Sequence, residues 1–161
     1  MGIFYVDIFI NKNNMRLQEN ITRIKEVMGI ITEDDKKSIS YSAVVLDHDS
    51  SEFLLDKFSG DIPDGWKKYG HHMTIALGKS AESIMGEDIL GSIQTLTVTQ
   101  IGVSDMAVAV RVEGFPSQNK IPHVTLAVNP DGGKPFMSNK IVDWKNVEPF
   151  EITGEVKNIY N

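Results

Sequence analysis

Two phrases of the sequence repeat each other: His72-Met73-Thr74-Ile75-Ala76-Leu77 and His123-Val124-Thr125-Leu126-Ala127-Val128. Histidine, threonine and alanine stand at the same places in both phrases, and apolar residues fill the other three places. This alternation predicts β-strands, because successive side chains of a strand point to opposite faces. The repeat therefore predicts two equivalent strands from two similar lobes, each with its histidine and threonine on one face and its apolar side chains in a core.

Patterns outside the repeat predict further strands and a few helices. Alternating or apolar runs predict strands over residues 2–10, 40–47, 71–77, 96–103, 106–113, 122–128 and 150–159. Helical spacing and capping residues predict helices over 13–30, 49–58 and 135–142, with a charged connector at 32–37 and a loop at 80–92 that holds at most a short helix. Strands outnumber helices, so the predicted class is α+β with mainly antiparallel sheet.

Length and composition indicate one domain. The chain of 161 residues can bury a substantial core but is too short for two ordinary independent domains. Its 41% hydrophobic and 24% charged residues are typical of globular domains. The absence of cysteine excludes disulfides, a thiol nucleophile and cysteine-ligated metal centres. We therefore expect a single domain over residues 1–161, in the cytoplasm and acting as a monomer.

The charge balance limits the partners. The formal net charge is −6, whereas proteins that hold long nucleic-acid duplexes are usually basic. Extensive duplex binding is therefore not expected, while a small anionic substrate or one end of an RNA strand is compatible with the charge. Residues 1–10 contain Asp7 and no basic region, and no apolar run could span a bilayer. We therefore expect neither a signal peptide nor membrane attachment.

The residue types of the repeat suit phosphodiester cleavage. A general base must activate water or a ribose hydroxyl, and a general acid must protonate the leaving oxygen on the far side of phosphorus. The imidazoles of His72 and His123 can divide these roles near neutral pH. The hydroxyls of Thr74 and Thr125 can donate hydrogen bonds to the non-bridging oxygens as charge builds there. A lone histidine-x-threonine pair is usually structural, so it is the matched repetition that favours catalysis without metal or cofactor.

These paired motifs resemble those of the two-histidine (2H) phosphoesterase superfamily. That superfamily includes 2',3'-cyclic nucleotide phosphodiesterases, 2'-5' RNA ligase-like proteins, the cyclic phosphodiesterase part of fungal and plant tRNA ligases, and phage enzymes that destroy cyclic nucleotide signals. The resemblance implies a bilobal α+β fold, with two mainly antiparallel sheets related by a pseudo-twofold axis around a central groove. It also implies metal-independent cleavage of a phosphodiester by the residues of the two motifs.

Other residues are candidates for substrate binding, with an ordinary structural role as the alternative for each. The aromatic candidates for stacking on a base are Tyr41, Trp66, Tyr69 and Phe136, of which Tyr41 and Trp66 rank first. The Gly-rich turn at 129–134 directly follows the second motif, and its backbone N–H groups and Lys134 can bind a phosphate. Ser138 is a further candidate near the same turn.

The two remaining histidines are expected to be structural or exposed. His71 faces away from His72 if both lie on a regular strand, and His48 precedes a helix at the surface. A zinc site built from His71, His72 and His123 is the alternative. Because adjacent histidines on a strand diverge and no His-Glu-x-x-His helix is present, no metal site is expected.

The sequence thus predicts a hydrolase, a metal-independent phosphodiesterase that acts on a 2',3'-cyclic phosphate at an RNA end or on a nucleotide. An enzyme that hydrolyses cyclic di- or oligonucleotide second messengers is an alternative within enzymes. A non-catalytic nucleotide- or RNA-binding module with the same groove is an alternative of another class. The motifs leave open which histidine is the acid, which bond breaks, and whether the process is RNA processing or signal degradation.

Overall fold

The computed structural model describes residues 38–161. The strand expected over residues 2–10, the helix over 13–30 and the connector at 32–37 lie outside the described residues.

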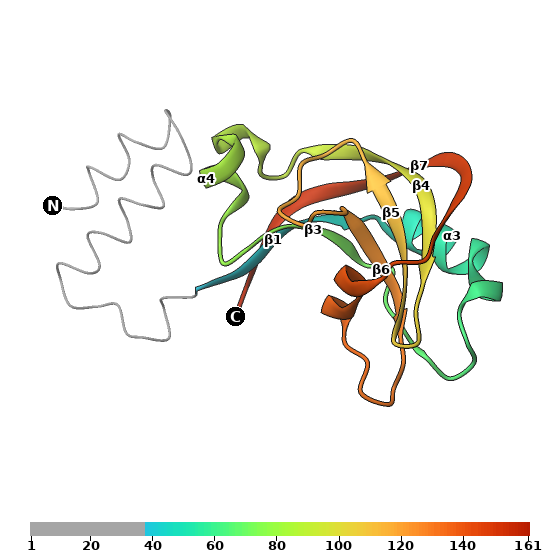
Figure 1. The fold of residues 1–161 in the computed structure, drawn as a ribbon. Helices are drawn as coiled ribbons and strands as arrows, with labels where there is room; N and C mark the ends of the chain where they lie inside the picture. The colour runs from blue at the N-terminus through green and yellow to red at the C-terminus, as the bar shows by residue number, and fades with distance from the viewer. Residues whose placement is uncertain (1–37) are drawn as a thin grey trace, which may run out of the picture. The chain divides into compact units, whose positions relative to one another are not determined.

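A closed antiparallel barrel of six strands forms the body of the described chain (Figure 1). Its strands are β1 (Ile39–Leu46), β3 (His72–Leu77), β4 (Ile93–Val103), β5 (Ala107–Glu113), β6 (His123–Val128) and β7 (Trp144–Tyr160). Around the barrel they follow the order β1-β3-β6-β5-β4-β7, and β7 pairs again with β1. The two-residue strand β2 (Lys67–Lys68) pairs with β6 just ahead of β3.

Alternation along the strands fills the barrel interior. Met73 and Ile75 on β3, and Val124 and Leu126 on β6, are no more than 2% exposed. The same core contains, among others, Val44, Leu96, Val98, Val108, Val110, Val112, Ile152 and Val156. Since β-branched residues fit a pleated, buried surface, this composition favours strands over helices here.

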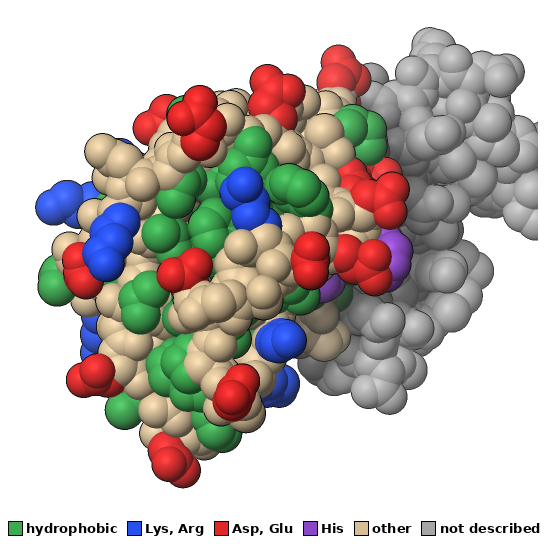
Figure 2. All heavy atoms as spheres, turned by 90° about the vertical axis from the view of Figure 1, so that its right-hand side faces the viewer, with side chains coloured by type: hydrophobic (Ala, Val, Ile, Leu, Met, Phe, Trp, Pro, Cys, Tyr) green, Lys and Arg blue, Asp and Glu red, His purple; other side chains and the backbone are tan. Residues whose placement is uncertain are grey.

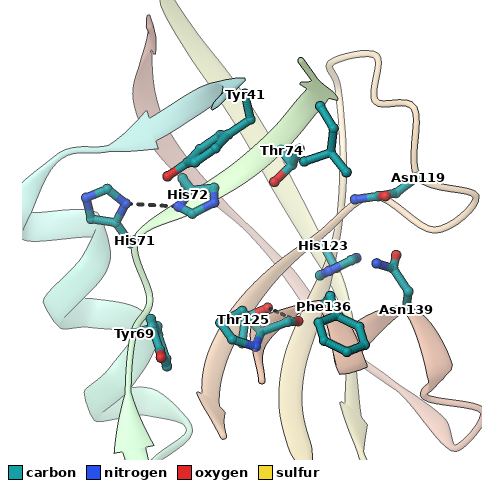
Figure 3. A pocket seen from close by; sticks show the side chains of 12 residues that line it. Tyr41, Tyr69, His71, His72, Thr74, Asn119, His123, Thr125, Phe136 and Asn139 are labelled. Atoms are coloured by element: carbon teal, nitrogen blue, oxygen red, sulfur yellow. Dashed lines mark hydrogen bonds between the residues drawn. The ribbon is translucent and has the colours of Figure 1, made fainter. Parts of the chain in front are cut away.

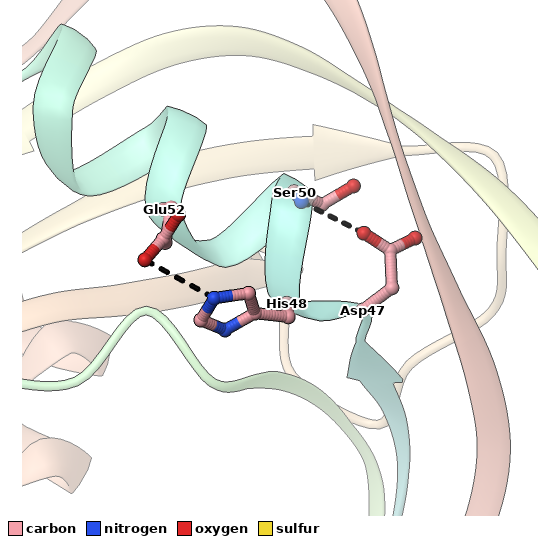
Figure 4. A network of polar contacts seen from close by, with 4 residues as sticks. All are labelled: Asp47, His48, Ser50 and Glu52. Carbon is pink, nitrogen blue, oxygen red and sulfur yellow. Dashed lines mark hydrogen bonds and ion pairs between the residues drawn. The ribbon is translucent and has the colours of Figure 1, made fainter.

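The helix α3 (His48–Lys57) follows β1 directly, and a short 3₁₀ turn η2 (Ser59–Asp61) comes after it. Asp47 caps the helix, because its Oδ1 accepts a 2.7 Å hydrogen bond from the backbone N–H of Ser50 (Figure 4). The other carboxylate oxygen accepts a hydrogen bond from the Thr153 hydroxyl on β7. His48 pairs with Glu52 one turn along, at 3.1 Å on the exposed face. The hydrogen bond from Thr153 attaches the start of α3 to the barrel.

Hydrophobic side chains gather on the face of the molecule that Figure 2 shows, with basic side chains among them. Phe53, which is 51% exposed, meets Phe150 edge to face at a centroid distance of 5.3 Å. The Lys57 ammonium lies 5.8 Å from the first ring and 5.0 Å from the second. These cation–π contacts partly cover the exposed rings and hold α3 against β7.

The remaining short elements are α4 (Ala81–Met85), η3 (Glu87–Ile89) and η4 (Pro135–Lys140). The last of these matters most for the site. Ile141, just after η4, is buried against Ala107, Ala109 and Val128 in a second small cluster, and Met137 of η4 packs onto it. Because Ala107 and Ala109 belong to β5 and Val128 to β6, η4 is fixed beside the second motif strand.

The architecture differs from the two facing sheets that were expected. Within residues 38–161 all strands belong to one sheet, and the two motif strands are antiparallel neighbours in it, paired at Met73 and Val124. The α+β, strand-rich class is as expected. Strand β7 begins at Trp144, several residues earlier than predicted, because its first part pairs with the end of β4. The predicted helix over 135–142 is the 3₁₀ element η4.

Among the described residues, no helix is long and apolar enough to cross a membrane.

Candidate active site

The strands β3 and β6 present their polar side chains on the outer face of the barrel. Since Met73 and Val124 point into the core, the alternate residues on each strand point out of it. These outward residues are His72 and Thr74 on β3 and His123 and Thr125 on β6. All four line one cavity of about 370 Å³ (Figure 3). The convergence that the repeated phrases predict is therefore present in the structure.

The cavity wall is polar and aromatic, and its described lining contains no carboxylate, lysine or arginine. The lining residues besides the four are Tyr41, Tyr69, His71, Leu77, Asn119, Pro135, Phe136 and Asn139. They come from β1, from the chain before β3, from the end of β3, from the loop before β6 and from η4. A negatively charged ligand would therefore meet imidazole, hydroxyl and amide groups from this part of the chain.

A backbone carbonyl just before β6 holds the His123 ring in place. Its ring is buried, and Nδ1 donates a 2.8 Å hydrogen bond to the carbonyl oxygen of Ile121. A carbonyl can only accept, so Nδ1 carries the hydrogen and Nε2 is the nitrogen free to act on a ligand. Burial lowers the pKa of His123, and the carbonyl opposes this by favouring the charged ring.

His72 is held by two other rings. The ring of Tyr41 stacks on it at a centroid distance of 4.9 Å and an interplanar angle of 26°. Its Nδ1 lies 2.9 Å from Nδ1 of His71, and the two imidazoles are nearly perpendicular (Figure 3). Burial lowers the pKa of His72 to about 4, with repulsion from His71 and then from His123 adding to the effect. His72 is therefore neutral in the free protein at pH 7.

Thr125 is positioned from η4. Its hydroxyl is 2.8 Å from the hydroxyl of Ser138, which is 1% exposed, and 3.4 Å from the carbonyl oxygen of Pro135. Since that carbonyl only accepts, Thr125 can donate to it or to a ligand while Ser138 donates to Thr125. On the other motif strand, the Ser117 hydroxyl donates a 2.6 Å hydrogen bond to the backbone carbonyl of Thr74. That bond fixes β3 against the loop that leads to β6.

The expectation that His71 faces away from the site is wrong. Gly70 directly precedes it with φ of 64°, a left-handed conformation that breaks the strand, and β3 begins only at His72. The alternation of a regular strand therefore does not apply to His71, which lines the same cavity as its neighbour. A glycine immediately before a short strand is the signal in the sequence that could have shown this.

The structure divides the other substrate-binding candidates. Tyr41 lines the cavity, as do Tyr69 and Phe136. Trp66 does not, because it packs against the hydrophobic core. Lys134 precedes η4 in an exposed position outside the described lining, and Ser138 lies beneath Thr125 rather than on the cavity surface.

Asn119 and Asn139 line the cavity, and the sequence analysis did not single them out. Asn119 lies in the loop before β6, and Asn139 is near the end of η4, with its amide close to His123 in Figure 3. Their side-chain amides add donors and acceptors on the side of the cavity that holds His123. No periodic pattern in the sequence marks such loop residues.

The histidines were also compared with the arrangement that a metal ion needs, within the part of the chain that the structure describes. Over residues 38–161, no group of three or more histidine, aspartate or glutamate side chains is placed to hold a metal ion. The arrangement instead supplies two imidazoles of different environment and two hydroxyls around one cavity. That set can move protons at two places and donate hydrogen bonds between them.

One of two comparisons with known proteins identifies a family for this chain. A search of curated protein sequences finds no match. Residues 18–159 match the fungal tRNA ligase phosphodiesterase domain, and this match covers both motif strands and every lining residue of the cavity. The chain therefore belongs to the family of tRNA ligase cyclic phosphodiesterase domains, within the 2H phosphoesterase superfamily.

Proposed function

We propose that this protein is a metal-independent hydrolase of cyclic phosphodiesters, with a 2',3'-cyclic phosphate at an RNA end or on a nucleotide as its substrate. The observation that carries the proposal is the placement of His72, Thr74, His123 and Thr125 around one cavity. Membership of a cyclic phosphodiesterase family supports the reaction class. The protein acts as a monomer in the cytoplasm and needs no cofactor.

The environments of the two histidines support different roles. His72 is the general base, because its low pKa leaves it neutral and able to take a proton from water. His123 is the general acid, because the Ile121 carbonyl that accepts from its Nδ1 favours the protonated ring. A bound phosphate anion favours the protonated form of both rings and so raises both pKa values. For His123 this brings the pKa closer to neutral pH, so that the ring can carry the proton it donates.

In this scheme water attacks phosphorus as its proton passes to Nε2 of His72. The bond from phosphorus to one ribose oxygen breaks, and Nε2 of His123 gives its proton to that oxygen. The hydroxyls of Thr74 and Thr125 donate hydrogen bonds to the non-bridging oxygens, where negative charge increases in the transition state. The products are a phosphomonoester and the free neighbouring hydroxyl.

Size and charge support a small substrate. A cavity of about 370 Å³ lies within the range of small-molecule sites, and Tyr41, Tyr69 and Phe136 offer ring faces to a base. The net charge of −6 disfavours extended contact with a duplex. Cyclic di- or oligonucleotide second messengers also contain phosphodiester bonds, and they are the alternative substrate.

The test is a panel of substrates incubated with the protein in EDTA. The panel contains 2',3'-cyclic mononucleotides, RNA oligomers that end in a cyclic phosphate, and 3',5'-linked cyclic dinucleotides. Hydrolysis of the first two groups, abolished in the His72→Ala and His123→Ala variants, is the expected result. Cleavage of cyclic dinucleotides alone would support the alternative substrate. Binding without turnover of any compound would instead identify a binding module, and activity that requires an added divalent metal would overturn the mechanism.

A further inference from the structure

The two motif histidines differ in what holds the ring nitrogen that faces away from the reaction. Nδ1 of His123 donates to a backbone carbonyl, which fixes its tautomer. Nδ1 of His72 has another imidazole as its partner, Nδ1 of His71 at 2.9 Å. An imidazole nitrogen can donate or accept, so the tautomer of His72 depends on that of His71.

We propose that His71 is a positioning residue that sets which nitrogen of His72 carries the proton. This inference rests on the proposed function, in which Nε2 of His72 must be free of hydrogen to accept a proton from water. That state requires the hydrogen on Nδ1 of His72, donated to an unprotonated Nδ1 of His71. When the base step makes the His72 ring positive, an unprotonated His71 that accepts this hydrogen bond stabilises the charge, whereas a protonated His71 would repel it.

Among the residues that line the cavity, His71 is the one placed to orient the His72 ring through Nδ1. The titratable side chains that line the cavity together with this pair are Tyr41 from β1, Tyr69 from the chain before β3, and His123 from β6. The described cavity lining contains no aspartate or glutamate that could orient His72 in its place. Burial keeps the Tyr41 hydroxyl neutral by raising its pKa, so Tyr41 contributes ring stacking rather than charge.

Protonation of His71 would reverse the arrangement. A protonated ring carries hydrogen on both nitrogens, so Nδ1 of His71 could no longer accept from His72. His71 is exposed to solvent, whereas His72 is largely buried. A hydrogen on Nδ1 of His71 would therefore remove the acceptor that orients the buried base.

Two substitutions at one position separate this role from a structural one. His71→Phe keeps an aromatic ring without an acceptor, and His71→Asn keeps an acceptor oxygen near the Nδ1 position without a charge. We expect kcat of His71→Phe to fall roughly tenfold to a hundredfold with KM changed less than about twofold. His71→Asn should retain kcat within about threefold of the parent. His48→Asn is the matched control, because His48 is an exposed histidine outside the cavity.

Nitrogen-15 NMR of the histidine side chains gives a readout that needs no substrate. Above pH 7, His72 should be in the Nδ1–H form in the parent and in His71→Asn, and should lose that preference in His71→Phe. The pKa of His72 should be higher in His71→Asn than in the parent, because repulsion from His71 is removed. These results can be obtained even if the proposed reaction fails on every substrate. An unchanged His72 tautomer in His71→Phe, or equal loss of kcat in both variants, would overturn the proposal.

Discussion

The imidazoles of His72 and His123 are expected to act as one unit. If one ring removes a proton while the other donates one, the loss of either stalls the same transition state. Each His→Ala variant should lower kcat by several orders of magnitude, and the double variant should lower it little further. The measurement is single-turnover hydrolysis of a cyclic-phosphate substrate, with the thermal midpoint as a check on folding. Near-normal turnover of either single variant would show that the repeated phrase is structural.

Thr125 and Ser138 form a second coupled pair, between β6 and η4. Their hydroxyls are 2.8 Å apart and Ser138 is buried, so Ser138→Ala leaves the Thr125 hydroxyl with only its 3.4 Å contact to the Pro135 carbonyl oxygen. We expect Thr125→Ala to lower kcat roughly tenfold to a thousandfold, as for one hydrogen-bond donor among several. Ser138→Ala should lower it less, and should remove part of the further effect of Thr125→Ala. A double-mutant cycle measures this coupling, and strictly additive effects would contradict it.

The sequence predicts these four motif side chains well and their partners poorly. Period-two alternation is a local property, so the outward face of each motif strand can be deduced without the fold. For His71 the alternation rule predicts the wrong face, because a regular strand does not extend across Gly70, where the backbone is left-handed. Trp66, a candidate for stacking on a base, packs against the core instead, since aromatic residues near a site are as easily structural. Asn119 and Asn139 reach the cavity only through the tertiary path of their loops.

At the scale of elements, the close pairing of β1 with β7 depends on Gly154. A Cβ atom at this position would lie 2.6 Å from the Val45 carbonyl oxygen and 2.8 Å from a Val44 methyl carbon. The first contact is with backbone in the middle of a paired strand, which cannot move without breaking the ladder. Gly154→Ala should therefore destabilise the protein by roughly 1–3 kcal/mol or more.

The matched control for Gly154 is Gly60→Ala. A Cβ at Gly60 meets nothing within 4 Å, and its backbone is not left-handed. Its free energy of unfolding should stay within about 0.5 kcal/mol of the parent in urea denaturation. If both variants unfolded at the same urea concentration, strand β7 would have to lie further from β1 than it does here.

The ends of the strands are predicted well where local sequence decides them, and poorly where pairing with a distant strand does. The predicted strands over 40–47, 106–113 and 122–128 lie within a residue of β1, β5 and β6, because their apolar alternation is strong. The sequence does not predict the start of β7, because residues 144–149 lack apolar alternation and contain Pro149, and this part becomes a strand only by pairing with β4. Propensity in strands is easily overridden by such pairing.

The whole-molecule architecture is the part that the sequence predicts least. The repeat correctly predicts two equivalent strands, but it cannot say whether they lie in two sheets or side by side in one. Closure of the barrel depends on β1 pairing with β7 and β3 with β6, contacts between residues far apart in the chain. One consequence of adjacency is that both histidines line the same cavity, His123 buried and His72 half-buried, and that His123 disfavours a charge on His72.

That shared burial predicts how the stability of the whole molecule depends on pH. The pKa values of His72 and His123 are below the ordinary imidazole value of about 6.5 in the folded protein. Above about pH 6.5 both rings are neutral in the folded and unfolded chains, and the free energy of unfolding is at its plateau. As pH falls, the unfolded chain binds protons that the folded chain does not, so stability is lost down to about pH 4.

The size of this loss is on the order of 1–3 kcal/mol for His72, since each unit of pKa difference corresponds to about 1.4 kcal/mol and residual solvent contact reduces the effect. Urea denaturation between pH 8 and pH 4.5 measures it. A His72→Asn, His123→Asn double variant should show a flatter curve over the same interval, because the two groups that take up protons on unfolding are gone. The Asp47 carboxylate does not confound the comparison, because hydrogen bonds from Thr153 and Ser50 lower its pKa and its contribution is lost below this interval. A double variant whose stability falls as steeply as the parent's would mean that other groups carry the pH dependence and that the two rings are better solvated than the cavity indicates.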